Sequence, residues 1–209
     1  MKLLILGATG GTGRQLVEQA LDDGHEVVAY VRTPQKLDIK HKNLDLIQGD
    51  LMEREKLAAA MSGVDAVLSG LGPVGNSAER PLTKGMAQIV QVMKEQQVSR
   101  LIVSTGAGVS DPNDQPTLAD KLIKFVLKLV SKEGLADSDG MIEVVRRSGL
   151  DWTVARGPRL LDKPGTGAVK VGYLGEGVST QLTRSDFAMF MLDQLQSNQW
   201  RHKAPVVSN

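Results

Sequence analysis

The sequence predicts an α/β protein with a Rossmann-like, doubly wound parallel sheet flanked by helices. Short apolar, β-rich runs alternate along the chain with segments whose apolar residues recur at helical spacing. The first run, residues 3–6, is followed by glycines at three-residue spacing, Gly7, Gly10 and Gly13. This first run is continuous rather than alternating, as in a strand buried on both faces. Strands that alternate with helices imply right-handed crossovers and a parallel sheet.

The first half of the chain follows this alternation closely. We expect strands at residues 3–6, Glu26–Val31, Leu44–Gln48, 64–69 and 100–104. We expect helices over Gly11–Asp22, Arg54–Met61 and residues 83–97. A glycine-rich loop, GLGPVGNS, follows the fourth of these strands.

The second half departs from it. A polar loop at 107–117 precedes two helical stretches, 118–131 and 137–148, where one crossover helix would suffice. A sixth strand is expected at 152–156, then a short hairpin near 168–174, a helix over 184–196 and a last strand at 204–207. We expect one domain over residues 1–209, in which about 157–209 contributes a small substrate-side lobe.

Composition excludes several classes of function. The formal net charge of the 209 residues is +1, so no large field of one sign indicates nucleic acid or an anionic membrane as a partner. The chain has no cysteine and only three scattered histidines, so we expect no disulfide and no metal site. The apolar run at the N-terminus is too short for a signal peptide or a membrane span. A cytoplasmic location is expected.

The glycines after the first strand predict a dinucleotide-binding turn. The first glycine permits the tight turn, the second lets a pyrophosphate approach the backbone, and the third lets the helix pack against the strand. The helix N-terminus adds free N–H groups and a partial positive charge. The alternative is a glycine-rich turn without a ligand. The predicted phosphate-binding residues are Gly7, Thr9, Gly10, Gly11, Thr12 and Gly13.

The residues after the second strand indicate whether the dinucleotide is NAD(H) or NADP(H). An NAD site usually has an acid there for the ribose hydroxyls. This chain has Arg32 and Thr33 instead, and its first acid is Asp38. A guanidinium at this place binds a 2′-phosphate through charge-assisted bonds, and Lys36 could add a second charge. The sequence therefore favours NADP(H) over NAD(H); the alternative is a surface arginine that caps a loop.

The ends of later strands extend this predicted site. Asp50 follows the third strand, where it could accept a hydrogen bond from an adenine amino group or cap the next helix, with Leu51 against the ring. The same edge of the sheet would carry Leu71 and Gly72 after the fourth strand and Ser104 and Thr105 after the fifth.

The segments LILGATGGTGRQLVEQALDDGHEVVAYVR, QGDLMERE, VDAVLSGLG, RLIVSTGAG, RRSGLDWTVARGPRL and LTRSDFAMFMLDQL resemble the atypical short-chain dehydrogenase/reductases. Within them, the chain is similar to the NAD(P)H-binding group that includes flavin reductase (biliverdin-IXβ reductase) and the NmrA-like proteins. The resemblance implies a cofactor site at the residues named above. It also implies that the turn from Arg156 to Pro158 lines the nicotinamide side.

Two departures from the superfamily bear on chemistry. Neither tyrosine, Tyr30 nor Tyr173, has a lysine four residues later, so the Tyr-x-x-x-Lys pair of most catalytic members is absent. Flavin-reductase-like members lack that pair too, but carry a serine after the fifth strand and a histidine after the sixth-strand proline. Arg159 stands at the histidine position, and Ser104 and Thr105 could substitute for the serine. These three are the candidate catalytic residues.

The expected function is NADPH-dependent hydride transfer to a flavin, quinone or similar small conjugated acceptor, because the cofactor carries that chemistry and no strong protein acid is required. A non-catalytic NADP(H)-binding redox sensor of the NmrA-like type is the alternative. A nucleotide-sugar epimerase or dehydratase ranks third, since such enzymes need a larger substrate domain. The expected partner is a small-molecule acceptor, and the protein is expected to be a monomer or homodimer.

One helix has an unusual pattern. LADKLIKFVLKLVSK, residues 118–132, has Lys121, Lys124, Lys128 and Lys132 at helical spacing among apolar residues. A crossover helix with a solvated lysine face is favoured over a membrane-surface helix. The apolar arc is wide enough that the helix could also cover the substrate or meet a second subunit.

Overall fold

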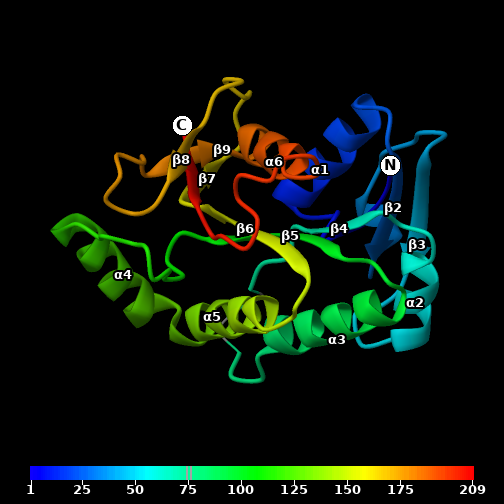
Figure 1. Ribbon diagram of the computed structural model, residues 1–209, viewed down its shortest axis with the longest axis horizontal. Helices are drawn as coiled ribbons and strands as arrows, with labels where there is room; N and C mark the ends of the chain where they lie inside the picture. The colour runs from blue at the N-terminus through cyan, green and yellow to red at the C-terminus, as the bar shows by residue number, and fades with distance from the viewer. Residues whose placement is uncertain (74, 76) are drawn as a thin grey trace.

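An eight-stranded sheet forms the centre of the structure, a computed structural model that describes residues 1–73, 75 and 77–209. Its order is β3-β2-β1-β4-β5-β6-β10-β8, and every pairing is parallel except that of β8 with β10 (Figure 1). The Rossmann-like order predicted from the alternating elements is confirmed. Val74 and Asn76, in the glycine-rich loop noted above, lie outside the described residues.

The strands are β1 (Lys2–Leu6), β2 (Glu26–Val31), β3 (Leu44–Gln48), β4 (Ala66–Ser69), β5 (Arg100–Gly106), β6 (Asp151–Gly157), β7 (Arg159–Leu161), β8 (Lys170–Gly172), β9 (Gln181–Thr183) and β10 (Val206–Ser208). The helices are α1 (Gly11–Asp22), α2 (Arg54–Met61), α3 (Pro81–Glu95), α4 (Leu118–Val130), α5 (Lys132–Arg146) and α6 (Arg184–Asp193), with a 3₁₀ turn, η1 (Pro34–Lys36).

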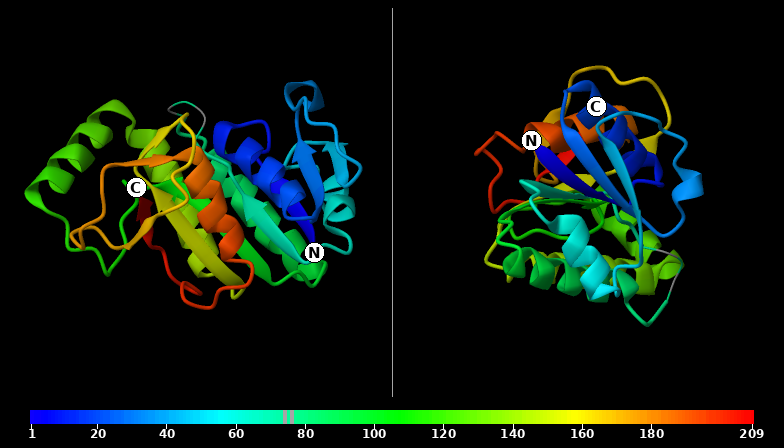
Figure 2. Two further views of the ribbon diagram at one scale, coloured as in Figure 1. Left: turned by 90° about the horizontal axis from the view of Figure 1, so that it is seen from above. Right: turned by 90° about the vertical axis from the view of Figure 1, so that its right-hand side faces the viewer.

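Helices cover both faces of the sheet. α1 and α6 lie side by side on one face, and α2, α3 and α5 lie on the other, as the end-on view of Figure 2 shows. Strand β1 serves both layers, because Leu3 and Ile5 belong to the apolar cluster under α1 and α6 while Leu4 and Leu6 belong to the cluster under α2, α3 and α5. Each such buried side chain contributes roughly 1.5–3 kcal/mol of burial free energy.

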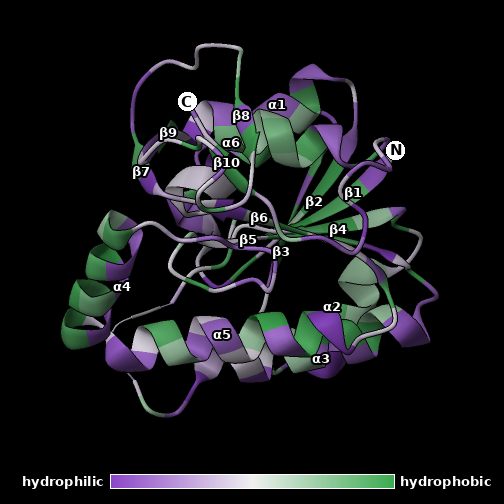
Figure 3. Ribbon diagram, turned by 60° about the vertical axis from the view of Figure 1, so that its left-hand side comes forward, coloured by the Kyte–Doolittle hydropathy of each residue, from purple (hydrophilic) through white to green (hydrophobic). Residues whose placement is uncertain are grey.

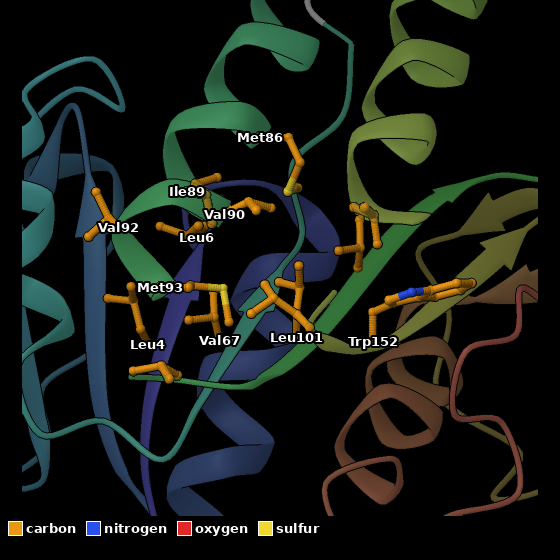
Figure 4. Packing of buried hydrophobic residues seen from close by; sticks show 14 of the residues in the cluster. Leu4, Leu6, Val67, Met86, Ile89, Val90, Val92, Met93, Leu101 and Trp152 are labelled. Carbon is orange, nitrogen blue, oxygen red and sulfur yellow. The ribbon is translucent and has the colours of Figure 1, made fainter. Parts of the chain in front are cut away.

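The cluster under α3 and α5 is the larger core. Figure 4 shows Leu4 and Leu6 of β1 facing Ile89 and Met93 of α3, with Trp152 of β6 at the far side. Helices pack on both faces of β1, β4 and β5, and for this reason the sequences of these strands are continuous apolar runs.

The tail of the chain corrects one expectation. No local hairpin forms at 168–174; β8 instead pairs antiparallel with β10, with Val206 opposite Gly172. Residues 159–161 and 181–183 form a separate parallel pair, β7 with β9, which the sequence analysis did not anticipate. These partners are far apart along the chain, so local patterning carries no signal for their pairing.

The two helices after the polar loop are both present, but the second begins earlier than expected. α5 starts at Lys132 rather than at residue 137, and only Ser131, whose backbone is not helical (φ −141°, ψ 56°), separates it from α4. Helix α3 also begins two residues early, at Pro81, a residue type favoured in the first turn of a helix. Among the described residues, no helix is both long enough and apolar enough to cross a bilayer.

Candidate functional site

Two cavities lie at the carboxyl ends of the parallel strands. The first, of about 440 Å³, is lined by the ends of β1, β2, β3 and β4 and by the start of α3. The second, of about 620 Å³, is lined by the ends of β5 and β6, the polar loop after β5 and one side of α4. Because β4 and β5 are neighbours in the sheet, the cavities open at adjacent strand ends, where open α/β sheets bind ligands.

The glycines of the turn after β1 differ in how closely other backbone atoms approach them. Gly7 has φ +74°, and a Cβ there would lie 2.8 Å from the carbonyl carbon of Gly70. A Cβ on Gly13 would lie 2.1 Å from the oxygen of Gly7. Gly10 is different, because a Cβ there would have only the oxygen of Gly7 within 4 Å among the described residues, at 3.3 Å. The space beside Gly10 is therefore open, as a close phosphate approach requires.

The N-terminus of α1 has no internal compensation for its positive end. No side chain caps it, and no acid lies in its first turn. By contrast, Thr117 caps α4 and Thr183 caps α6 through their hydroxyls. The first amides of α1 have no intrahelical partner, so they can donate to an anion. The open space at Gly10 and this uncapped helix together fit a dinucleotide pyrophosphate.

Arg184 is a second cation at this turn that sequence reasoning did not identify. A Cβ on Gly11 would lie 2.5 Å from its Nε, so Gly11 makes room for an arginine side chain from α6. The Arg184 guanidinium also pairs with Asp162, at 2.8 Å. No local motif marks this contact, because the two residues belong to elements at opposite ends of the chain.

Arg32 is one of two cations that line the first cavity, and Lys84 of α3 is the other. The Arg32 side chain is exposed at the end of β2, and its guanidinium makes no hydrogen bond or salt bridge with the residues that the structure describes. The nearest acid in sequence, Asp38, is paired with Arg14 at 2.5 Å. The hydrogen bond from Arg14 lowers the pKa of the Asp38 carboxyl. Asp38 is thus occupied, and Arg32 is available for an anion.

The floor of the first cavity includes a tyrosine that the sequence analysis left in the strand. The Tyr30 hydroxyl donates to the Asp50 carbonyl at 2.8 Å, and burial raises the pKa of Tyr30 to about 12, so the phenol stays protonated. Gly49 permits this placement, because a Cβ there would lie 2.1 Å from the Tyr30 hydroxyl oxygen. The only signal for this placement of Tyr30 in the sequence is Gly49, the glycine that directly follows β3.

Asp50 does not cap the next helix, because the N-cap of α2 is Glu53. The Asp50 Oδ1 instead accepts from the Met52 amide at 3.0 Å, which closes a turn before that helix, and Asp50 lines the first cavity. Leu51 packs toward Gly85 of α3 and lines the same cavity. Of the other predicted cofactor residues, Thr9, Leu71 and Gly72 line this cavity; Thr12 is buried, and Thr33 is exposed outside the lining.

The loop at 107–117 forms one wall of the second cavity. Asp114 receives two hydrogen bonds from Arg156, both of 2.7 Å, and Asp111 pairs with Arg146 at 2.8 Å. Both carboxylates are almost fully buried. The two ion pairs fasten the loop to β6 and α5.

This pairing corrects the expectation for Arg156. Its side chain has no exposed surface, and its guanidinium also donates to the carbonyls of Val109 and Ala204. Arg156 is therefore a structural residue and does not reach a ligand. Burial alone would raise the pKa of Asp114, but hydrogen bonds, first from Arg156, hold it below its ordinary value. Pro158, two residues on, does line the cavity.

The charges of the second cavity are unbalanced. Its three acids are engaged, since Asp120 accepts from Thr117 and the other two hold the arginines just described. Its cations Lys121, Lys124 and Arg159 form no salt bridge with any described residue. Lys124 donates only to the Ser110 hydroxyl. The cavity therefore offers positive charge to whatever enters it.

Only one of the three candidate catalytic residues lines a cavity. Arg159 lies in the wall of the second cavity. Ser104 is buried within β5, and its hydroxyl donates to the Ser69 carbonyl at 3.1 Å, so that group is engaged in the sheet. Thr105 is half-buried and directly precedes Gly106, which lines the cavity.

Comparison with known proteins agrees with this geometry. The profile of the NAD(P)H-binding family matches residues 7–198. The uncharacterized protein YwnB of Bacillus subtilis is 25% identical over 206 residues, which cover 94% of this chain and 92% of that protein. A short-chain dehydrogenase/reductase from Veillonella parvula in complex with NADP aligns with TM-score 0.82 at 20% identity, covering 100% and 94% of the two chains. ChuY, an anaerobillin reductase from Escherichia coli O157:H7, aligns with TM-score 0.76 at 18% identity, covering 100% and 97%.

Proposed function

The chain belongs to the NAD(P)H-binding family, and on that premise we propose that it is an NADPH-dependent oxidoreductase that reduces a small conjugated acceptor such as a flavin or quinone. One observation carries the proposal: a cavity lined by the glycine turn after β1 and a separate cation-lined cavity open at the ends of adjacent strands, β4 and β5, of one sheet. A neighbour of similar fold is described as a reductase and another as a complex with NADP, which is compatible with this activity.

The proposed cofactor is NADP(H) rather than NAD(H). The turn at Gly10 and the uncapped N-terminus of α1 would hold the pyrophosphate. Arg32, exposed and without a partner among the described residues, would bind the 2′-phosphate, while Asp38 is kept occupied by Arg14. Tyr30 and Leu51 would support the adenosine half. When bound, the cofactor supplies the hydride.

The second cavity is the proposed acceptor site. Its lining includes Ile123, Leu127 and Pro158 beside the cations, so it offers both apolar surface for a planar ring system and charge for an acidic substituent. Lys121 and Arg159 approach from α4 and β7 and would orient the acceptor's anionic group. We therefore extend the proposal to a conjugated acceptor that carries carboxylate or phosphate.

The protein's contribution to this reaction is position and exclusion of water. The Tyr-x-x-x-Lys pair is absent, since neither Tyr30 nor Tyr173 has a lysine four residues later, and the Tyr30 hydroxyl donates to the backbone carbonyl of Asp50. Reduction of a flavin or quinone does not depend on a strong protein acid, because the electrons enter a conjugated system. Holding the two ring systems together supplies much of the rate.

A second candidate is a non-catalytic sensor that reports cofactor occupancy to a partner. One observation favours it: each charged residue that lines the second cavity is either bound to another residue or exposed to solvent. The missing tyrosine pair favours both candidates equally.

A measurement of turnover distinguishes the enzyme from the sensor. Oxidation of NADPH is followed by loss of nicotinamide absorbance with flavins, quinones and aldehydes, each offered as an acidic and a neutral member where both exist. We expect turnover well above the buffer rate, and faster with acidic acceptors. Tight NADPH binding with no turnover of any acceptor would reject the enzyme in favour of the sensor.

A further inference from the structure

Helix α4 has its apolar side turned away from the protein. It projects at one end of the molecule beyond α5, and Figure 3 shows its hydrophobic turns at the edge, with no other element outside them. Its eight large apolar side chains are between 40% and 85% exposed, and no residue of α4 is buried. This arrangement is the reverse of an ordinary amphipathic surface helix.

The inner side of α4 is already occupied. Asp120, Lys121 and Lys124 face the second cavity together with Ile123 and Leu127. Leu127 packs toward Gly108 of the polar loop, and Lys124 donates to Ser110 of that loop. Three polar residues of the helix, Asp120, Lys121 and Lys124, thus lie on the side of its own protein, whereas Lys128 is exposed and outside the cavity lining.

The outer side of α4 is a continuous apolar stripe. It consists of Leu118, Leu122, Phe125, Val126, Leu129 and Val130, none of which lines the cavity. These residues recur at the three- and four-residue spacing that places side chains on one helix face. At roughly 100 Å² for each side chain, the stripe presents on the order of 600 Å² of apolar surface. Monomeric proteins rarely leave a larger apolar patch than this exposed.

We propose that this outer stripe of α4 is a self-association surface, buried against the same stripe of a second copy of the chain. Two such stripes would remove on the order of 1,200 Å² from water, the lower limit for a specific interface. An isologous pair needs a self-complementary patch. An uncharged stripe meets that condition, because no like charges are brought together.

The distribution of lysines favours a second copy over an anionic lipid surface. A membrane-surface helix directs its cations toward the headgroups at the border of its apolar face. Here two of the three lysines of α4, Lys121 and Lys124, line the cavity behind the helix instead, and only Lys128 lies outside that lining. Because Ile123 and Leu127 of the same helix line that cavity, a second copy on the outer stripe would also fix one of its walls.

Sedimentation equilibrium over a series of protein concentrations tests this proposal. We expect the unmodified chain to dimerise reversibly, and Phe125→Glu together with Leu129→Glu to raise the dimer dissociation constant by at least about tenfold. The fold should persist, because neither side chain is buried. Leu46→Glu is the matched control, since Leu46 is an exposed apolar residue on β3, and its substitution should leave dimerisation unchanged.

Cross-linking supplies an independent measurement. The chain has no cysteine, so a single cysteine at Leu118, Leu122, Phe125 or Leu129 can react only with its copy in a second molecule. At least one of these variants should cross-link with a short bifunctional reagent, and Leu46→Cys should not. A protein that sediments as a monomer throughout the series overturns the proposal, and so does a dimer unaffected by the α4 variants. A monomer that cosediments with anionic vesicles assigns the stripe to lipid and also overturns it.

Discussion

The guanidinium of Arg156 and the carboxylate of Asp114 form a bidentate, almost fully buried ion pair, with both N···O distances at 2.7 Å. The pair joins the end of β6 to the loop that forms one wall of the second cavity. A buried guanidinium without its partner is costly, because its charge has no access to water. The loop is therefore held by charge, although its sequence is that of a polar turn.

Asp114→Ala should destabilise the protein by about 3–5 kcal/mol, the usual cost of leaving one member of a buried pair alone. Urea unfolding measures this loss. The matched control is Asp162→Ala, which removes the partner of Arg184 at a carboxylate that is 83% exposed. That substitution should cost about 1 kcal/mol or less. Equal losses in the two variants would contradict the structural role of the buried pair.

The same pair predicts a dependence of stability on acid. The pKa of Asp114 is lower in the folded protein than its ordinary value, which the unfolded chain has. Its contribution to stability is complete above that ordinary value, about 4, and is lost as the pH falls through the lower folded value. The urea midpoint of the unmodified chain should therefore drop more steeply below pH 4 than that of Asp114→Asn, which cannot titrate. Parallel profiles would argue against the lowered pKa.

Gly10→Val should abolish NADPH binding while the fold is retained. Gly10 has φ −86°, which valine can adopt, and the space beside it is open apart from the Gly7 oxygen. A side chain there would occupy the place of the phosphate. Calorimetry measures binding, and thermal unfolding measures the fold. Gly13→Ala is the contrasting variant: its Cβ would lie 2.1 Å from the Gly7 oxygen, so it should lower the melting temperature. Normal NADPH binding by Gly10→Val would reject this turn as the phosphate site.

Arg32→Ala should weaken NADPH binding by roughly ten- to a hundredfold and leave NADH binding nearly unchanged, because a charge-assisted bond to phosphate contributes about 1.5–3 kcal/mol. Arg32→Asp should reverse the preference, since a carboxylate repels the 2′-phosphate and accepts from free ribose hydroxyls. Fluorescence titrations with both cofactors at one salt concentration measure this. Lys40→Ala, an exposed cation outside the cavity lining, is the control. An equal loss for both cofactors in Arg32→Ala would reject the assignment of NADP.

Arg159→Gln should raise the KM for an acidic acceptor by about tenfold, because one charge-assisted bond of about 1.5 kcal/mol is lost. The KM for a neutral quinone should not change, and kcat should be largely preserved. Steady-state oxidation of NADPH with the two acceptor types measures the difference. Lys128→Gln on α4 is the control, since Lys128 does not line the cavity. A similar rise in KM for both acceptors would mean that Arg159 does not recognise the acceptor's charge.

The sequence by itself determined the parallel sheet, the glycine turn and the absence of an acid beside Arg32. These features depend on residues that are close along the chain: apolar periodicity, the spacing of Gly7, Gly10 and Gly13, and the residue that ends β2. Local chemistry is sufficient for them, because a strand, a tight turn and a helix N-terminus are each built within a few residues.

Only the tertiary structure decided which charged groups are free. Asp114 and Arg156 are 42 residues apart, and their pairing turned an expected cofactor contact into a buried structural residue. The orientation of α4 about its axis is a similar case. The periodicity of its sequence defines an apolar and a polar face, but it does not show which face packs against the protein. The sequence specifies the chemical type of each side chain and its spacing from others along the chain. Its partner, its burial and therefore its availability to a ligand depend on elements that meet only when the sheet is assembled.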